Sequence, residues 1–467
     1  MSTTSRPRVP PVLAGGLPRS LHDGTRLLDG AELLSHAHSA AAELAAAGVG
    51  PGSRVAVEAD TEPVTRLARM LGADLLGAAT LLVDPDWSTT ERAGTLADAA
   101  PHVVVGGRIR PGHPPPTLPE ADGSSLFYLP TTSGSTSRPR VLARTRSSWW
   151  HSFEAFEVGV TGRDTVLVPG PVGSSLFLFG ALHAMHLGAG LRLLPRWSAH
   201  AAARACREAT VVHVVPSMLS ALLAVLARHP QLREDCRVRR FVCGGAAVDD
   251  GLRAELERTL PGSELVEYYG SAEHSLVALR GSDGVLHPAR AVETDIRDGE
   301  GSVPPGETGT LWVRSPLACS GHLEAGRLVP LPEGFHTVGD LAVPRDGGGF
   351  TVLGRGSGTI DSGAELVPAE SVEHVLRPVP GVRDVVVAAT PHPRFGSLVT
   401  AVIETDPTHP PEAAELRRVA RRELNGNRRP RRWLTTGALP RTSTGKPARG
   451  LITERLAAGT LAAEPLR

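Results

Sequence analysis

The sequence predicts an α/β protein with a large N-terminal domain of parallel-rich sheets and helices plus a β-subdomain, followed by a small α+β C-terminal domain. Three observations support this fold class. β-like runs alternate with helical stretches up to about residue 285, shorter β-like pieces separated by Gly and Pro follow, and a Gly/Ser-rich segment precedes roughly the last 110 residues. A length of 467 residues also suits several folding units.

The first half of the chain alternates between helical and extended patterns, which is typical of parallel sheets covered by helices. Helices are expected at Ala31–Ala47, Glu62–Gly77, Ser217–Ala227 and Asp249–Leu260. Strands are expected at Arg54–Glu58, Val103–Val105, Leu126–Leu129, Val166–Val168, Val211–Val215, Phe241–Cys243 and Leu265–Tyr269. The Pro/Gly-rich stretch Gly106–Ser125 is expected to be a loop.

The second half predicts two further parts. Thr310–Arg314 is one of the short β-like pieces, and Gly354–Gly358 (GRGSG) is a plausible hinge because its small residues tolerate large backbone changes. A helix at Ala369–Leu376 and a strand at Asp384–Ala389 indicate an α+β unit beyond it. We therefore predict an N-terminal domain at 1–353, a hinge at 354–358 and a C-terminal domain at 359–467.

Composition excludes several classes of protein. Basic and acidic residues both total 49, so nucleic acid is not expected as a partner. No apolar run reaches the roughly 18 residues of a membrane span, and the Pro/Arg-rich start lacks the apolar core of a secretory signal. The cysteines form no C-x-x-C pair and fit reduced cytoplasmic thiols; they are Cys206, Cys236, Cys243 and Cys319.

Lysine usage is unusual. Of the 49 basic residues Lys446 alone is lysine, which leaves 48 arginines. It lies in the Gly-containing stretch Pro440–Arg449 (PRTSTGKPAR). A lysine kept where every other cation is arginine can act as a compact, mobile charge on a carboxylate and a phosphate together. The alternative is an ordinary surface lysine.

Thr131–Ser137 (TTSGSTS) follows a predicted strand. Hydroxyl residues around a glycine offer N–H and O–H donors that can cradle phosphate, and Arg140 adds a cation. A solvated Ser/Thr linker explains the composition equally well. The stretch around Lys446 is not a Walker A loop, because Pro447 follows the lysine and the upstream glycine is missing.

Glu267–Glu273 (EYYGSAE) places an acid four residues after an aromatic across a predicted glycine turn. Tyr269 can stack on a base, and Glu273 can hold Mg²⁺ with phosphate oxygens. Asp340, in Val-Gly-Asp, can accept hydrogen bonds from ribose hydroxyls, and Arg355 can reach ribose or phosphate. A strand followed by a glycine turn explains Glu267–Glu273 equally well, and residues such as Asp340 and Arg355, taken singly, are more often turn residues.

In this order the motifs resemble the acyl-CoA synthetase branch of the adenylate-forming superfamily of AMP-dependent synthetases and ligases. The family's phosphate loop T-S-G-[ST]-T-G-x-P-K is similar to Thr132–Arg140, and its Y-G-x-T-E to Tyr269–Glu273. Its T-G-D aspartate matches Asp340, its hinge G-R matches Gly354-Arg355, and its closing G-K-x-x-R matches Gly445–Arg449. The ordered motifs span more than about 300 residues, which makes the resemblance specific.

The resemblance implies a role for each matched residue. ATP and AMP would be bound by Thr132, Ser133, Gly134, Ser135, Thr136, Arg140, Gly245, Ala246, Tyr269, Gly270, Asp340 and Arg355. Ser174, Gly244 and Gly245 would border the acid pocket, Glu273 would bind Mg²⁺, and Ser362 with Gly363 would line a thiol route. Lys446 would bridge the acid and the α-phosphate until the mobile C-terminal domain rotates it away.

Four positions depart from the family pattern. Ser137 replaces a glycine, Ala272 replaces a threonine, Ser174 stands where a pocket histidine is usual, and Ser357 replaces the usual hinge acid or lysine. His183 and His186 are expected to be helix residues instead. These changes leave the ligand set in place and put the rate and the acceptor in question.

The leading hypothesis is an enzyme, an acyl- or aryl-CoA ligase that uses ATP, Mg²⁺ and coenzyme A and acts on a small carboxylic acid. No aspartate near Gly170–Ser175 is present to hold an amino group, so an uncharged acyl or aryl tail is favoured. The eight arginines between Arg417 and Arg432 could instead meet an acyl carrier protein, so an acyl-AMP ligase that delivers to a carrier or another nucleophile stays open. A non-catalytic nucleotide-binding relative is the third hypothesis.

Overall fold

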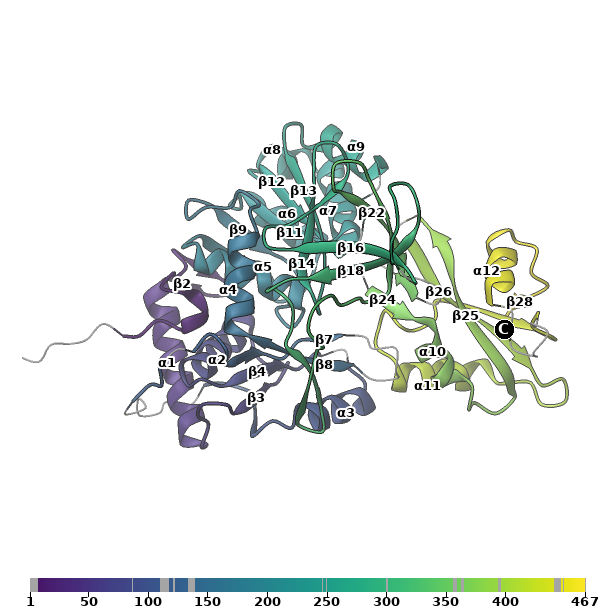
Figure 1. The fold of residues 1–467 in the computed structure, drawn as a ribbon, viewed down its shortest axis with the longest axis horizontal. Helices are drawn as coiled ribbons and strands as arrows, with labels where there is room; N and C mark the ends of the chain where they lie inside the picture. The colour runs from purple at the N-terminus through teal and green to yellow at the C-terminus, as the bar shows by residue number, and fades with distance from the viewer. Residues whose placement is uncertain are drawn as a thin grey trace, which may run out of the picture. The chain divides into compact units, whose positions relative to one another are not determined.

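The computed structural model describes most of the chain, as two compact units. The described residues are 7–85, 87–109, 117–120, 122–132, 139–245, 247–248, 250–299, 301–355, 359–362, 365–393, 396–440, 447 and 449–466. Figure 1 shows the helices and strands of the chain with their labels. The first unit comprises Met1–Pro85, Leu96–Thr131 and Val141–Gly354. The second comprises Asp86–Thr95, Thr132–Arg140 and Arg355–Arg467.

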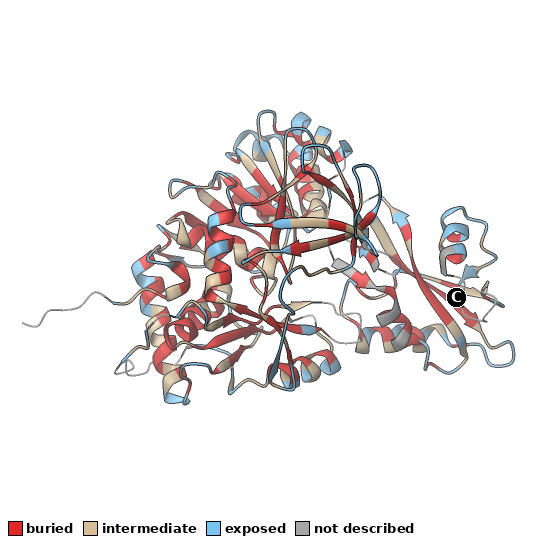
Figure 2. Cartoon of the chain, in the orientation of Figure 1, coloured by how far each residue is buried: buried red, intermediate tan, exposed pale blue. Residues whose placement is uncertain are grey.

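The largest sheet of the first unit has a parallel part, as the alternating pattern predicts. Strands β10, β9, β11, β12 and β13 follow one another in parallel, with β1 parallel to β10 and β2 antiparallel to β1. The strands are β1 (Leu21–His22), β2 (Leu27–Leu28), β9 (Thr165–Val168), β10 (Gly190–Leu193), β11 (Val211–Val214), β12 (Arg240–Cys243) and β13 (Glu264–Ser271). Their centres are buried (Figure 2), which explains why they are short Val- and Leu-rich runs without alternation.

Beyond β13 the same sheet becomes antiparallel. Its order continues β14, β15, β22, β21, β18, β16 and β17, and the β13–β14 hairpin makes the change of direction. These strands are β14 (Ser275–Arg280), β15 (Leu286–Pro288), β16 (Glu293–Asp298), β17 (Gly301–Ser302), β18 (Gly309–Arg314), β21 (Asp340–Pro344) and β22 (Phe350–Arg355). This part is the β-subdomain that the Gly/Pro-punctuated sequence predicts.

A second sheet has the order β20-β19-β8-β6-β4-β3-β5, with β7 paired to β8. Its strands are β3 (Arg54–Val57), β4 (Ala79–Leu82), β5 (Val103–Val105), β6 (Leu126–Tyr128), β7 (Thr131–Thr132), β8 (Arg140–Thr145), β19 (Gly321–Glu324) and β20 (Arg327–Pro330). Strands β3, β4, β5 and β6 pair in parallel, and β8, β19 and β20 add antiparallel neighbours.

Helices connect the strands of both sheets. They are the 3₁₀ turn η1 (Pro11–Leu13) and the helices α1 (Gly30–Ala46), α2 (Pro63–Leu75), α3 (Thr89–Ala99), α4 (Arg146–Ala155), α5 (Ser175–His186), α6 (Ala199–Ala205), α7 (Pro216–Arg228), α8 (Pro230–Glu234) and α9 (Asp250–Thr259). Helix α1 begins at a capping box in which Asp29 accepts from the Glu32 amide and Glu32 accepts from the Asp29 amide, both at 2.8 Å. None of the described helices is long and apolar enough to cross a bilayer.

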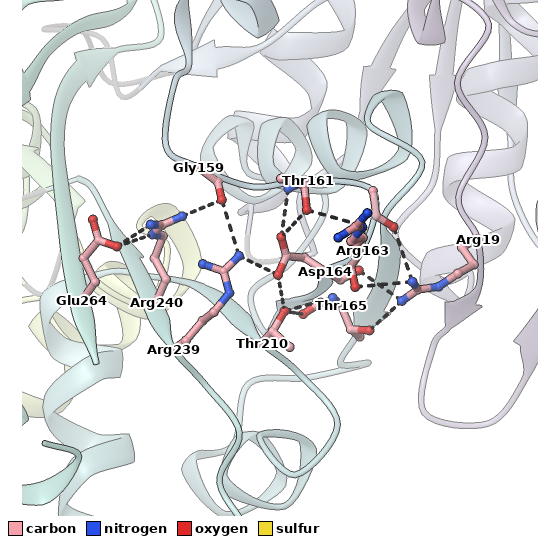
Figure 3. A network of polar contacts seen from close by, with 11 residues as sticks. Arg19, Gly159, Thr161, Arg163, Asp164, Thr165, Thr210, Arg239, Arg240 and Glu264 are labelled. Carbon is pink, nitrogen blue, oxygen red and sulfur yellow. Dashed lines mark hydrogen bonds and ion pairs between the residues drawn. The ribbon is translucent and has the colours of Figure 1, made fainter. Parts of the chain in front are cut away.

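A polar network around the buried Asp164 holds the start of β9 to its neighbours in the sheet (Figure 3). Asp164 accepts hydrogen bonds from Thr210 and Arg239 at 2.7 Å and from the Thr161 amide at 2.9 Å. Burial raises the pKa of Asp164, but these donors outweigh it and lower the pKa to about 2. The network therefore fixes where β9 and β11 begin, upstream of the strand ends that carry the site.

The second unit contains an α+β arrangement. Its sheet has the order β24-β23-β26-β27-β28 with β25 paired to β26. The elements are β23 (Thr359–Ser362), β24 (Glu365–Pro368), α10 (Ala369–Leu376), β25 (Val382–His392), β26 (Gly396–Thr405), α11 (Ala413–Glu423), β27 (Arg432–Thr436), α12 (Arg449–Ala457) and β28 (Glu464–Pro465). Alternate residues of β25 face two cores: Val385 and Val387 meet the α10 and α11 side, whereas Val386 meets Ile452 of α12.

The predicted elements are present, with ends displaced by a few residues. One interpretation was wrong. Gly270 does not form a turn, because β13 continues through Gly270 to Ser271 and the turn follows at residues 272–274. A side chain at Gly270 would meet the Ser275 carbonyl oxygen at 2.2 Å, so this glycine is required by close backbone approach within the hairpin.

Candidate active site

The β13–β14 hairpin carries three of the predicted site residues. Its register shifts between Tyr269 and Gly270, a β-bulge that redirects the end of the strand. Glu273 lies in the hairpin turn, and its carbonyl oxygen accepts a hydrogen bond from the Cys319 amide at 2.7 Å. The turn is therefore anchored to a segment outside the hairpin, and it presents Glu273 as a half-buried carboxylate.

Two motifs that are far apart in sequence meet directly in the first unit. The Tyr269 hydroxyl donates a hydrogen bond to the Asp340 carboxylate, and the residues are 71 positions apart. Asp340 is buried at the first position of β21 and follows Gly339, whose φ of 82° suits glycine. The Tyr269 ring also meets Phe350 edge to face at 6.2 Å. The structure thus joins a base-stacking candidate to a ribose-binding candidate.

Gly244 and Gly245 follow β12, the strand beside β13. A side chain at Gly244 would meet the Tyr268 ring at 2.3 Å, so glycine lets that ring lie against the strand end. Gly245 has a φ of 86° and turns the chain away from the sheet. Ala246 lies outside the described residues. The predicted pocket glycines and Tyr269 therefore lie on adjacent parallel strands, at their carboxyl ends.

Ser174 is the N-terminal cap of α5, and its side chain makes no capping hydrogen bond. Helix α5 is largely buried, and both His183 and His186 are helix residues as predicted. The Tyr128 hydroxyl, from β6, lies near the start of α5, and burial raises its pKa to about 12. This hydroxyl stays protonated, so it can donate a hydrogen bond at this end of α5.

The remaining predicted residues are in the second unit or outside the described residues. Thr132 ends β7, Arg140 begins β8 and is exposed, Arg355 ends β22, and Ser362 is a buried residue of β23. Ser133, Gly134, Ser135, Thr136, Gly363 and Lys446 lie outside the described residues, as do Ser137 and Ser357. The roles of all of them stay predictions.

The sequence analysis missed one ionic group beside the site. Glu267 is buried on β13 and pairs with Arg280 at 2.8 Å and with Arg253. In the sequence Glu267 stands out only as the first residue of the Glu267–Glu273 motif. We assign Glu267 a structural role, because its arginine partners on β14 and α9 hold the strand that carries Tyr269 against its neighbours.

Comparison with known proteins assigns the chain. The family model described as "AMP-binding enzyme" matches residues 107–323, and that of "AMP-binding enzyme C-terminal domain" matches 371–446. The chain belongs to the AMP-binding enzyme family. An uncharacterized acyl–CoA ligase of Bacillus subtilis, YhfT, is 31% identical over 72% of this chain and 70% of its own length.

Other relatives span more of this AMP-binding enzyme. A feruloyl-CoA synthase of Amycolatopsis sp. is 29% identical over 93% of this chain and 95% of its own length. The solved o-succinylbenzoate CoA synthetase of Bacillus subtilis shares its fold, with a TM-score of 0.85 over 98% of this chain and 100% of that one at 21% identity. The predicted family, fold class and acid–thiol ligase activity, with use of ATP and coenzyme A, are confirmed.

Proposed function

We propose that this acyl-CoA ligase works in the cytoplasm, activates a carboxylic acid with an uncharged acyl or aryl tail by means of Mg²⁺-bound ATP, and transfers the acyl group to coenzyme A. In the first step an acid oxygen bonds to the α-phosphorus and pyrophosphate leaves, which gives an acyl-AMP. In the second step the thiolate sulfur bonds to the acyl carbon and AMP leaves. The hydrogen bond from Tyr269 to Asp340 carries the proposal, because it brings two of the motifs for one nucleotide into contact.

Asp340 and Glu273 are assigned separate roles. The buried Asp340 carboxylate is oriented by Tyr269 and can accept hydrogen bonds from both ribose hydroxyls. Glu273 is a single carboxylate on a fixed hairpin turn. Magnesium in ATP-dependent sites is usually held by one or two carboxylates together with phosphate oxygens, so one glutamate is a sufficient protein ligand.

Lys446 is proposed to supply the positive charge for the first step alone. A compact ammonium between the acid and the α-phosphate would stabilise the charge that develops at phosphorus. Support comes from the sequence, in which Lys446 is the single lysine among 49 basic residues. The domain boundaries 1–353, 354–358 and 359–467 are likewise proposals, supported by the change of compact unit between Gly354 and Arg355.

An aromatic acid is the favoured substrate class. Relatives of this chain include feruloyl-CoA synthases and 2-succinylbenzoate–CoA ligases, whose names contain aromatic acyl groups. The Tyr268 ring, which packs on the predicted pocket residue Gly244, also belongs to a larger group of aromatic side chains. A cytoplasmic location is supported by the four cysteines, which are all free thiols.

A second candidate differs only in the acceptor. Helix α11 exposes Arg417, Arg418, Arg421 and Arg422, of which Arg418 pairs with Glu415 at 2.6 Å and Arg422 with Glu423 at 2.5 Å. The basic residues favour an acidic partner, either the phosphates of coenzyme A or an acyl carrier protein.

Pyrophosphate release tests the proposal. The enzyme is mixed with ATP, Mg²⁺ and a panel of aromatic and aliphatic acids, and the acid-dependent rate is measured; omission of Mg²⁺ is the control. Coenzyme A or a carrier protein is then added, and the thioester is identified by mass. We expect release with at least one acid and a thioester with coenzyme A. A thioester with the carrier protein alone supports the second candidate, and no release with any acid contradicts both.

A further inference from the structure

Aromatic side chains of the first unit are concentrated beside the predicted acid pocket. Only 4% of the chain is aromatic, yet Trp149 and Phe153 of α4, Phe156, Phe179 of α5 and Tyr268 of β13 form a continuous group. Phe156 meets Phe179 at 5.0 Å and Tyr268 at 5.3 Å, both edge to face. We call these five residues the aromatic group.

Two buried histidines complete this group. His213 of β11 is 0% exposed and lies 6.1 Å from Phe156, and His183 of α5 is 3% exposed and lies 5.2 Å from Phe156. Among the described residues neither ring nitrogen of His213 has a hydrogen-bond partner, nor does Nδ1 of His183. His186, on the same helix, differs because its Nδ1 lies 3.0 Å from the Leu13 carbonyl oxygen.

Burial determines the charge of these two rings. Burial lowers the pKa of His213 to about 4. Burial is also the main reason why the pKa of His183 is lowered to about 3, and the nearby His213 and His186 lower it further. At neutral pH each ring is uncharged and offers one N–H donor and one acceptor nitrogen. Buried polar atoms are nearly always hydrogen-bonded in native proteins, so we expect these three nitrogens to have a partner that the described residues do not supply.

The histidines are joined to the acid pocket through direct contacts. Tyr268 packs on Gly244, Phe156 meets Tyr268, and both histidine rings meet Phe156. Helix α5, which carries His183, begins next to Ser174. The rings of Tyr268 and Phe156 therefore link Gly244 to both histidines.

The two ring nitrogens of His213 lie at different distances from α5. A side chain built on Gly180 would meet Cγ and Nδ1 of His213 at 2.9 Å and Cδ2 at 3.1 Å. The part of the ring next to its Cβ therefore packs on α5, and Nε2 lies at the opposite end of the ring. Glycine at position 180 is what allows this approach.

We propose that the far end of the bound acid reaches His213 and His183, and that these histidines select an aromatic monocarboxylic acid whose far end carries a neutral hydroxyl group. This inference rests on the proposed ligase function and adds the substrate class. The aromatic group suits a flat ring through edge-to-face and offset contacts. A hydroxyl both donates and accepts, which matches a neutral imidazole, whereas a second charged group would be buried without a counter-charge.

Paired substrates and matched variants test the inference. The probes are 4-hydroxybenzoate against benzoate and 4-hydroxycinnamate against cinnamate, and the readout is the ratio of kcat/KM for pyrophosphate release within each pair. We expect the wild type to favour the hydroxylated acid by about 10-fold or more in one pair, because a site that binds a hydroxyl rejects the analogue without it. His213→Leu and His183→Phe should bring that ratio close to 1.

His186→Leu is the matched control, since it removes a histidine whose ring nitrogen already has a partner. It should leave the ratio unchanged. Circular dichroism establishes that each variant is folded, and His183→Phe decides the matter if His213→Leu does not fold. A ratio that neither variant alters, as expected if a buried water satisfies the nitrogens, overturns the inference, and so does a wild type that uses only aliphatic acids.

Failure of the ligase proposal gives a different result. If no acid releases pyrophosphate, binding is measured directly from quenching of tryptophan fluorescence, since Trp149 belongs to the aromatic group. Tighter binding of the hydroxylated acid that is lost in His213→Leu then supports the inference without the ligase function. Equal binding of both acids contradicts it.

Discussion

The pH dependence of stability gives a quantitative test of the buried histidines, through the variant His213→Leu. His213 is fully buried and its folded-state pKa is about 4, against an ordinary value of 6.5. The unfolded chain therefore binds a proton between pH 6.5 and 4 that the folded chain does not. The stability that a neutral His213 contributes is fully present above pH 6.5 and is lost as the pH falls through this window.

The magnitude follows from the shift. One pKa unit corresponds to about 1.4 kcal/mol, so a displacement from 6.5 to about 4 represents roughly 3 kcal/mol over the whole window. Between pH 6.5 and pH 5 the wild type should lose roughly 2 kcal/mol more than His213→Leu. The variant is expected to be less stable than the wild type at pH 7 through poorer packing, and that loss does not depend on pH.

Urea unfolding followed by tryptophan fluorescence measures this difference at pH 7, 6.5, 5.5 and 5. The control is His229→Leu, which removes an exposed histidine and should parallel the wild type at every pH. A constant difference between wild type and His213→Leu from pH 7 to pH 5 would refute the reasoning, because it would mean that the folded protein takes up the proton as readily as the unfolded one.

Three substitutions test other contacts in the first unit. Tyr269→Phe removes the hydrogen-bond donor to Asp340 and should raise the KM for ATP by roughly 10-fold, because a hydrogen bond to a charged group is worth about 1.5–3 kcal/mol. The melting temperature should change little. An unchanged KM would argue against a shared nucleotide site. Gly270→Ala places a methyl group 2.2 Å from the Ser275 carbonyl oxygen and should abolish pyrophosphate release, whereas full activity would show that the bulge is dispensable. Asp74 and Arg146 form a buried ion pair at 2.5 Å, so Asp74→Ala leaves the Arg146 charge without its carboxylate and should cost about 3–5 kcal/mol in urea unfolding. A loss below about 1 kcal/mol would contradict the importance of this ion pair.

The elements that the sequence predicted best are those whose patterns are local. Helix α1 is signalled by an Ala/Leu-rich run, and β5 and α10 occupy the residues expected for them. Buried parallel strands are short Val-rich runs between turn residues, so their positions were also predictable. The ends of helices and strands were harder to predict, because caps such as Asp29 depend on hydrogen bonds that form only in the folded chain.

Features that depend on contacts between distant segments were not predictable. The bulge in β13 arises from pairing with β14, and the sequence alone suggested a turn at Gly270. His213 and His183 looked like ordinary strand and helix residues, because their surroundings come from α4, α5, β11 and β13 together. The sequence feature that could have indicated a buried histidine was the position of His213 inside a Val-rich strand (VVHVV).

The most direct test of the central claim is to measure the two half-reactions of Lys446→Ala separately. Acid-dependent pyrophosphate release should fall by about 10²-fold or more, as when other groups that stabilise a transition-state charge are removed. Thioester formation from supplied acyl-AMP and coenzyme A should stay within a few-fold of the wild type. Lys446→Arg, which keeps the charge, should also be slow in the first step, because a planar guanidinium does not replace a compact ammonium. Equal loss of both half-reactions, or an unimpaired first step, would contradict the account.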